Sequence, residues 1–274
     1  ELIRLHRPIG IFLLLWPIWW SLWLATAGLP SLKLLIIFTA GVFLMRSAGC
    51  IINDLIDQPF DGNVQRTQYR PLITHAITQT QALVFFILLC LIALALVLQL
   101  NLITVLLACL ALVLSVLYPF MKRIIYLPQL VLGVAWYIGI LMAFTAVNGH
   151  LNATAWLVYI TGIIWTIIYD TMYAMVDRND DILIGIKSTA ILFGRFDTSI
   201  LALLQLSMIL LLCLIGDINH LSWPYYIGII VASSFFLYQQ YLIKNRQPAN
   251  CLAAFSNNHW VGMSIFLGIF FSLI

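Results

Sequence analysis

The chain has 274 residues, of which 63% are hydrophobic and only 8% are charged, and its formal net charge is +3 at pH 7. A single water-soluble core could not enclose so many apolar side chains, so the composition excludes a soluble globular domain and predicts an integral membrane protein. The positive charges are dispersed along the chain, which argues against a nucleic-acid partner and leaves membrane lipid as the expected surroundings.

Apolar runs long enough to cross a membrane recur along the whole sequence. A helix needs about 20 mainly apolar residues to cross the ~30 Å hydrocarbon core of a bilayer. Nine such runs are expected as transmembrane helices, at residues 9–27, 34–52, 82–100, 102–120, 130–147, 153–173, 199–216, 223–242 and 260–274. The alternating pattern of a membrane β-barrel is absent from the sequence, so the predicted fold class is all-α. Because no linker or change of composition divides the chain, we expect a single transmembrane domain over residues 1–274.

The first apolar run has an alternative interpretation. Arg4 and Arg7 precede it and Ala-Thr-Ala follows at 25–27, a combination that imitates a secretory signal peptide with its cleavage site. Pro17 and four tryptophans within the run are unusual for a signal core and typical of an interfacial or cavity-lining helix. We therefore expect a transmembrane helix.

The distribution of Lys and Arg between the runs predicts the orientation in the membrane. Connections on one side carry eleven of these residues, namely Arg4, Arg7, Arg66, Arg70, Lys122, Arg123, Arg178, Lys187, Arg195, Lys244 and Arg246. The other side carries only Lys33, and Arg46 lies inside the second run. Since cytoplasmic connections are enriched in Lys and Arg, the N-terminus and the two long polar connections at 53–81 and 174–198 are expected to face the cytosol.

The second run leads into an acid-rich window formed by Asn53, Asp54, Asp57 and Asp61. On a continuing helix, Asn53, Asp57 and Asp61 share one face because their spacing is i, i+4, i+8. Toward the N-terminus the same helix face includes Arg46. A basic residue inside a membrane helix is costly to bury, so Arg46 is a candidate functional residue. A structural ion pair of Arg46 with Asp57 or Asp170 is the alternative.

A second acid-rich window ends the sixth run, with one stripe formed by Asp170, Tyr173, Asp177 and Asp181. The two windows together hold seven of the ten acidic residues of the chain. A solvated helix end would explain one such group. Two groups with similar spacing on the same expected side of the membrane favour a shared site, in which packed carboxylates need a cation to offset their repulsion.

Mg²⁺ fits this ligand set best, because it prefers oxygen and is typically held by one or two carboxylates together with substrate phosphates. The expected metal ligands are Asn53, Asp54, Asp57, Asp61, Asp177 and Asp181. Two stripes facing one another would bind two Mg²⁺ ions with a diphosphate between them. Arg66, Arg70 and Lys187 are the nearby bases expected to contact its oxygens, with Arg195 a further candidate. The string GIKST at 185–189 lacks the spacing of a Walker motif, so ATP is not inferred.

Several longer strings resemble the UbiA superfamily of intramembrane prenyltransferases, in particular its branch that acts on 4-hydroxybenzoate. They are RPIGIFLLLWP at 7–17, LMRSAGCIINDLIDQPFDGNVQRTQYRPL at 44–72, YPFMKR at 118–123, LPQLVLG at 127–133 and YDTMYAMVDRNDDILIGIKSTAILFG at 169–194. The resemblance covers nearly the whole chain. Departures are Arg7, where the family commonly has lysine, and residues 73–75, where it has a turn similar to Pro-Ser-Gly.

The resemblance implies nine transmembrane helices around a central cavity with cytosolic caps, in a bacterial inner membrane. It also implies Mg²⁺-dependent transfer of a polyprenyl group from its diphosphate to the ring of 4-hydroxybenzoate, ortho to the hydroxyl, in ubiquinone synthesis. The implied catalytic residues are Asp54, Asp57, Asp61, Asp177 and Asp181.

The implied substrate-binding residues are Arg46, Asn53, Arg66, Arg70, Lys122, Arg123, Asp170, Tyr173 and Lys187. Arg46 is the first candidate for the benzoate carboxylate, with Lys122 and Arg123 as competitors. The last two would alternatively serve only to anchor the topology. A carboxylate or the diphosphate would accept the ring proton.

Other functions remain as alternatives at this point. A haem or naphthoate prenyltransferase would share both acid-rich windows. A cation-coupled transporter would also place acids in the membrane, but its site should lie near the midplane on broken helices. Membrane phosphotransferases that act on CDP-alcohols use spaced aspartates, but the Asp-Gly and Ala-Arg pattern that precedes their acids is missing.

Overall fold

The structure, a computed structural model, describes residues 2–6, 8–62 and 67–274, except for the side chain of Phe60. Within these residues the chain is helical and forms no strand. The elements are α1 (Ile9–Thr26), α2 (Leu32–Asp61), α3 (Gln79–Val97), α4 (Leu102–Ile124), α5 (Pro128–Trp136), α6 (Ile138–Asn148), α7 (Ala153–Ile184), α8 (Thr189–Phe193), the 3₁₀ turn η1 (Gly194–Phe196), α9 (Asp197–Ile218), α10 (Trp223–Ile243) and α11 (Pro248–Leu273).

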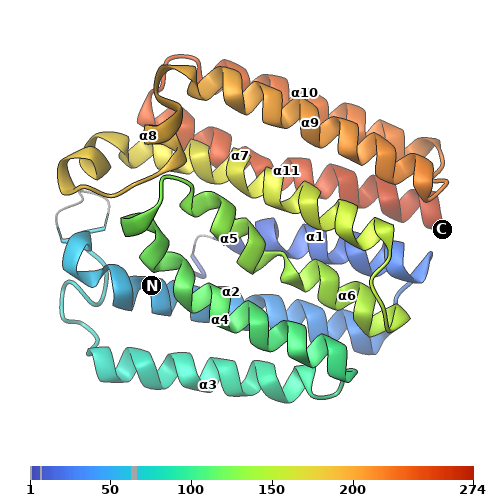
Figure 1. Cartoon of the computed structure of the whole chain (residues 1–274), viewed down its shortest axis with the longest axis horizontal. Helices are drawn as coiled ribbons and strands as arrows, with labels where there is room; N and C mark the ends of the chain where they lie inside the picture. The colour runs from blue at the N-terminus through green and yellow to red at the C-terminus, as the bar shows by residue number, and fades with distance from the viewer. Residues whose placement is uncertain (1, 7, 63–66) are drawn as a thin grey trace.

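The long helices run side by side along the long axis of the molecule (Figure 1). In the described part of the chain, eight segments are long and apolar enough to cross a membrane: α1, α2, α3, α4, α5 with α6, α7, α8 with α9, and α10. Helix α11, with 26 residues, is a ninth long helix and packs along α10, α1 and α7. The expected all-α membrane fold is therefore confirmed.

Two departures from the expected runs result from packing between helices. The run expected at 130–147 is interrupted at Tyr137, which separates α5 from α6. The ring of Tyr137 is fully buried against Gly162 of α7, and its hydroxyl donates to the carbonyl of Leu13. This packing fixes the position of the bend.

Helix α11 begins twelve residues before the expected start at 260. The expectation failed because the first half of the helix is polar. Asn258 accepts a hydrogen bond from the indole of Trp165, and Asn257 accepts one from Gln239, so these amides are satisfied by neighbouring helices inside the bundle. Polarity that is satisfied in this way does not end a buried helix.

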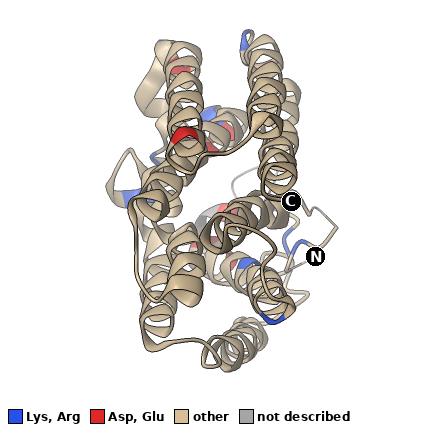
Figure 2. Ribbon diagram, turned by 90° about the vertical axis from the view of Figure 1, so that its right-hand side faces the viewer, with Lys and Arg blue, Asp and Glu red and all other residues tan. Residues whose placement is uncertain are grey.

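The surface is apolar where the helices face outward. Leu83, Leu88, Leu206, Ile230 and Leu237 are all about half exposed or more. Figure 2 views the bundle from one end and shows that charged residues occupy only a small part of the ribbon. Exposed leucine and isoleucine along successive turns suit contact with lipid tails.

The two acid-rich windows lie at the ends of the longest helices. Helix α2 continues past the apolar run to Asp61, and α7 continues to Ile184, so both windows are helical. Residues 67–78, which lead into α3, and the connection that contains α8 lie at the same end of the bundle, at the left of Figure 1. The cavities described next are at that end and extend from it along the bundle.

Candidate functional site

A cavity of about 1250 Å³ opens between the N-terminal helices, α7 and α11. One part of its lining is polar and includes Arg4, Arg46, Asn53, Asp54, Arg70, Tyr118, Lys122, Asp170, Tyr173 and His259. Much of the remaining lining comes from apolar side chains of α1, α2, α3 and α4, such as Phe38, Leu91, Leu94, Val97 and Leu112. The cavity therefore has one end suited to charged groups and a long flank suited to hydrocarbon.

A second, polar cavity of about 120 Å³ is lined by Asp57, Asp61, Thr67, Arg70, Tyr118, Lys122, Pro128, Gln129, Asp170, Tyr173, Ala174, Asp177, Asp181, Ile186, Lys187 and Ser188. Acids from both windows thus face one space. Arg70, Lys122 and Asp170 line both cavities, so the polar pocket adjoins the charged end of the large one.

The three carboxylates of α2 are buried, with 2% of Asp54, 8% of Asp57 and 7% of Asp61 exposed. Each of them has a basic partner. Arg4 and Arg70 contact Asp54, Arg70 also contacts Asp61, and Lys122 donates to Asp57 at 2.8 Å. These pairs offset the cost of placing three like charges along two turns of one helix.

Asn53 has the position expected from its spacing with Asp57. Its amide nitrogen donates to Asp57 Oδ2 at 2.9 Å, and its amide oxygen accepts from Lys122 Nζ at 3.1 Å. The three side chains form a closed triangle of hydrogen bonds, which leaves Asp57 oriented by two donors. A carboxylate held in this way has a defined direction before any ligand binds.

Asp61 lies just beyond the apolar part of α2. Burial raises the pKa of its carboxyl above the usual value, Arg70 opposes this shift, and the negative charges of Asp57 and Asp54 add to it. The raised pKa shows that burial first, and then the neighbouring carboxylates, disfavour the charged form of Asp61, and a bound cation would favour that form again.

The donor set of the polar pocket fits a hard divalent cation, because carboxylates from α2 and from α7 face the same space, while Asn53 and Asp54 of α2 line the adjoining large cavity. Within the described residues no group of three or more carboxylate, histidine or cysteine side chains is arranged as a preformed metal cluster. A metal ion at this site would compete with Arg70 and Lys122 for the oxygens of α2.

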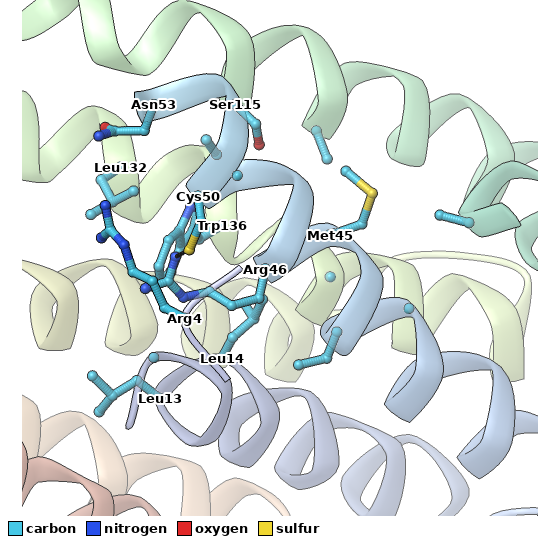
Figure 3. Close-up of a pocket in the computed structure, with 18 of the residues that line it drawn as sticks. Arg4, Leu13, Leu14, Met45, Arg46, Cys50, Asn53, Ser115, Leu132 and Trp136 are labelled. Atoms are coloured by element: carbon cyan, nitrogen blue, oxygen red, sulfur yellow. Dashed lines mark hydrogen bonds between the residues drawn. The ribbon is translucent and has the colours of Figure 1, made fainter. Parts of the chain in front are cut away.

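Arg46 is held inside the bundle by three kinds of contact. Its guanidinium donates to Cys50 Sγ at 2.7 Å and lies 5.0 Å from the ring centroid of Trp136. A Cβ atom at Gly10 of α1 would lie 2.8 Å from Arg46 Cζ, so glycine makes room for the guanidinium. Figure 3 shows the side chain among Arg4, Cys50 and Trp136 on the wall of the large cavity. The anticipated alternative of an ion pair with Asp57 or Asp170 is not among these contacts.

Other basic residues from the sequence analysis lie in different places. Lys187 lines the polar pocket, but its ammonium donates to the carbonyl of Ile124 and lies 5.2 Å from the ring of Tyr126. Arg123 donates to the carbonyl of Ile56 and is not part of either cavity lining. Arg195 lies over Phe196 and also stays outside both linings. Arg66 falls outside the residues that the structure describes.

The α7 stripe provides the opposite wall. Asp177 and Asp181 line the polar pocket, while Asp170 and Tyr173 line both cavities. The ring of Tyr173 packs against Phe255 of α11, with 4.7 Å between centroids. Asp180, on the same helix, is not part of either lining.

Sequence reasoning missed several residues of the site. Arg4 was treated only as a topological charge, although it reaches Asp54. Tyr118, Ser188 and His259 line the cavities without belonging to an acid-rich window. The string YPFMKR, singled out for the resemblance, was a usable signal for Tyr118. His259 had no such signal, because its approach to the cavity depends on how α11 packs.

The comparisons with known proteins agree with this geometry. The family model described as "UbiA prenyltransferase family" matches residues 14–268. The chain is 56% identical over 269 residues to a 4-hydroxybenzoate octaprenyltransferase from Tolumonas auensis, a match that covers 98% of this chain and 94% of that protein. It is 53% identical to the protein of the same name from Salmonella paratyphi B, covering 98% and 93%.

Solved structures share the fold. A UbiA homolog from Aeropyrum pernix K1 superimposes with a TM-score of 0.84 at 22% identity, covering 97% of this chain and 98% of the other. A UbiA homolog from Archaeoglobus fulgidus bound to GPP and Mg²⁺ superimposes with a TM-score of 0.72 at 18% identity, covering 99% and 98%. From the family match, the close relatives and the shared fold it follows that the chain belongs to the UbiA prenyltransferase family.

Proposed function

We propose that the protein transfers a polyprenyl group from polyprenyl diphosphate to the ring of 4-hydroxybenzoate, at the carbon ortho to the hydroxyl. The observation that carries the proposal is the pair of adjoining cavities, in which two carboxylate stripes meet beside a long apolar flank. The names of the close relatives, both 4-hydroxybenzoate octaprenyltransferases, support this acceptor over haem or naphthoate. Such a reaction is an early step in making a prenylated quinone such as ubiquinone.

The diphosphate group is assigned to the polar pocket. Asp57, Asp61, Asp177 and Asp181 would hold Mg²⁺ there, together with Asn53 and Asp54, which line the large cavity that the pocket adjoins. When bound, Mg²⁺ neutralises phosphate charge and so weakens the bond between the diphosphate and the allylic carbon. The bound Mg²⁺ and GPP in the Archaeoglobus fulgidus homolog support the choice of ion.

Basic side chains at the pocket assist the departure of the diphosphate. Arg70 and Lys122 line both cavities, so they can reach phosphate oxygens once these approach the α2 carboxylates. Hydrogen bonds from charged donors strengthen as the C–O bond breaks and negative charge grows on the leaving group. Lys187 and Arg66 are assigned the same task, on the basis of the sequence resemblance.

The aromatic acceptor is assigned to the inner part of the large cavity. Arg46 is the residue proposed to bind its carboxylate, because a guanidinium makes two parallel hydrogen bonds to a carboxylate and this one lines the cavity. Lys122 is engaged with Asp57 and Asn53, and Arg123 with a backbone carbonyl, so neither is the first candidate.

Bond formation then follows from the arrangement of the substrates. The allylic C–O bond breaks, the diphosphate keeps the electron pair, and the ring carbon ortho to the hydroxyl forms a bond to the allylic carbon. The ring proton leaves to a carboxylate of the pocket or to the diphosphate, which restores aromaticity. Breaking the C–O bond leaves positive charge on the allylic carbon. Apolar side chains around the large cavity exclude water, which would otherwise add to this allylic cation.

The location proposed is a bacterial inner membrane, with the polar pocket facing the cytosol. The two long connections belong to the side whose connections and N-terminal segment carry eleven of the thirteen Lys and Arg, which favours the cytosolic side for them. The segments 67–77 and 185–196, with the short helix α8, are proposed to cap the pocket on that side.

The direct test is a reaction with purified protein in detergent, Mg²⁺, labelled 4-hydroxybenzoate and polyprenyl diphosphates of several lengths. We expect a product whose mass equals acceptor plus prenyl group minus one hydrogen, and no product with EDTA. A prenylated naphthoate or haem derivative in parallel reactions, without any product from 4-hydroxybenzoate, would assign a different acceptor.

A further inference from the structure

Two side chains of the polar pocket carry hydrogen-bond donors that the reaction described above does not use. Gln129, the second residue of α5, and Ser188, which directly precedes α8, line this pocket, and neither lines the large cavity. They are only 4% and 3% exposed. Polar groups buried to this extent are normally hydrogen-bonded, so an unused donor at the wall of a pocket indicates a ligand.

The hydrogen bond that Gln129 makes determines the direction of its amide. The amide oxygen accepts from the backbone nitrogen of Thr189 at 3.1 Å. A backbone N–H only donates, so the oxygen must face Thr189 and the NH₂ group points elsewhere. This NH₂ group makes no hydrogen bond to the described residues. Among them, Trp23 Nε1 is the one side-chain nitrogen or oxygen that is both enclosed by protein and without a partner. The NH₂ group of Gln129 is therefore open to the polar pocket.

Ser188 lies beside this amide and also has an unused hydrogen. Its oxygen accepts from the backbone nitrogen of Ile191 at 3.4 Å, as the N-cap of α8. That contact uses a lone pair of the hydroxyl, and the hydroxyl hydrogen has no acceptor among the described residues. Because Ser188 directly precedes Thr189, whose N–H binds Gln129, the two donors share one wall of a pocket of only about 120 Å³.

This wall lies away from the large cavity. Arg70 and Lys122 line both cavities and so mark their junction. A prenyl diphosphate with its tail in the large cavity places the phosphate that carries the ester oxygen at the junction and the terminal phosphate deeper in the polar pocket. Gln129 and Ser188 then adjoin the terminal phosphate. Helix α5 begins at the same wall with Pro128, and the positive end of its dipole also favours an anion.

The ligand that suits these donors must bring acceptor oxygens. The carboxylates of the pocket are assigned to Mg²⁺, and a water held by Mg²⁺ turns its hydrogens outward, so phosphate oxygens are the acceptors that remain. We propose that the NH₂ group of Gln129 and the hydroxyl of Ser188 donate to the terminal phosphate and thereby select a prenyl diphosphate over a monophosphate. The inference rests on the proposed function and adds two residues that position its leaving group.

The experiment compares two ligands that differ only by the terminal phosphate. Gln129→Met keeps the length of the side chain and removes the donor. We expect the dissociation constant of a short polyprenyl diphosphate, measured with Mg²⁺ and without acceptor, to rise about tenfold, as for loss of one hydrogen bond to a charged group. The dissociation constant of the matching monophosphate should stay the same. Ser188→Gly removes the hydroxyl at an N-cap position, where glycine is tolerated, and should act in the same direction.

Gln79→Met is the matched control. Gln79 is exposed at the start of α3 and lies outside both cavity linings, so this variant should bind both ligands as wild type does. A purely structural role of Gln129, through its hydrogen bond to Thr189, would weaken the diphosphate and the monophosphate by the same factor. The ratio of the two dissociation constants therefore separates direct contact with phosphate from support of α8.

The inference is overturned if Gln129→Met and Ser188→Gly leave the affinity for the diphosphate unchanged, or weaken both ligands equally. Failure of the proposed function has a different signature, because the wild-type protein would then form no prenylated 4-hydroxybenzoate, whereas the binding measurement needs no acceptor. A wild-type preference for the diphosphate that shrinks in both variants supports the inference.

Discussion

Gly10 leaves space for the guanidinium of Arg46, and this gives a way to disturb Arg46 without removing its charge. In Gly10→Ala the added methyl group meets the flexible end of the arginine, which must move away. We expect the KM for the aromatic acid to rise about tenfold or more, with little change in the KM for the lipid diphosphate, since displacing one bidentate contact costs on the order of 1.5–3 kcal/mol. Steady-state kinetics with each substrate varied in turn measures the difference.

The matched control is Gly28→Ala, in the connection after α1, where an added Cβ meets nothing within 4 Å. It should behave as wild type. Equal increases in both KM values for Gly10→Ala would show a general distortion of α1 and would remove Arg46 from the acceptor site.

Asp177 and Asp180 provide a second comparison on one helix. Asp177 lines the polar pocket and Asp180 does not. Asp177→Asn is expected to lower kcat by about 100-fold or more, the usual cost of losing one group that stabilises transition-state charge. Asp180→Asn should retain most of the activity. Similar losses in both variants, with the protein still folded in detergent, would contradict the proposed role of the α7 stripe.

At the scale of elements, one buried carboxylate connects three segments near the pocket. Asp197, the first residue of α9, is fully buried and accepts from Arg178 of α7 and from Arg246 between α10 and α11. Arg178 follows Asp177 directly in the chain, so this ion pair also positions the end of α7 that carries the proposed metal ligands.

Replacing Asp197 by alanine leaves two arginines without their partner. Breaking a buried pair costs about 3–5 kcal/mol, and we expect the lower end because both arginines are partly exposed. The thermal unfolding temperature in detergent should fall by several degrees. Asp217→Asn, at the exposed opposite end of α9, is the control and should change it little. An unchanged melting temperature for Asp197→Ala would mean that the arginines find water or other acceptors instead.

The helices and the acid stripes were predictable from the sequence, whereas their contacts were not. Runs such as α3 and α9 are apolar on every side, and membrane length then dictates a helix. The spacing of Asp57, Asp61, Asp177 and Asp181 placed them on helix faces correctly because the helices continue beyond the apolar runs.

The features that the sequence did not predict depend on packing between segments that are distant in the chain. The bend at Tyr137 follows from a glycine 25 residues later in the chain, and the early start of α11 follows from amide partners on α7 and α10. Arg4 and His259 entered the site in the same way, through contacts with residues about 50 and 243 positions away. Local patterns carry no information on such partners.

At the scale of the whole molecule, the large cavity explains how a long lipid tail is accommodated. Small residues of α4, including Ala108, line its apolar flank. Since α4 runs from Ala108 toward Lys122, Ala108 lies several turns from the polar end. Ala108→Phe should therefore obstruct only the distal part of a tail.

We expect this variant to retain activity with short polyprenyl diphosphates and to lose it progressively with longer ones. The measurement is kcat/KM across a series of chain lengths. Leu110→Phe is the control, because Leu110 is exposed on the outer surface. A uniform loss at all lengths would indicate that the tail follows another path.

The division of the cavity into a charged end and a hydrocarbon flank also governs what happens after bond formation. The reaction yields one very water-soluble product, inorganic pyrophosphate, and one lipid. A charged group is expelled by apolar walls, and a polyprenyl chain gains nothing by entering water. The two products therefore depart toward opposite environments. Because they are separated as soon as they form, recombination is rare and net synthesis proceeds in one direction.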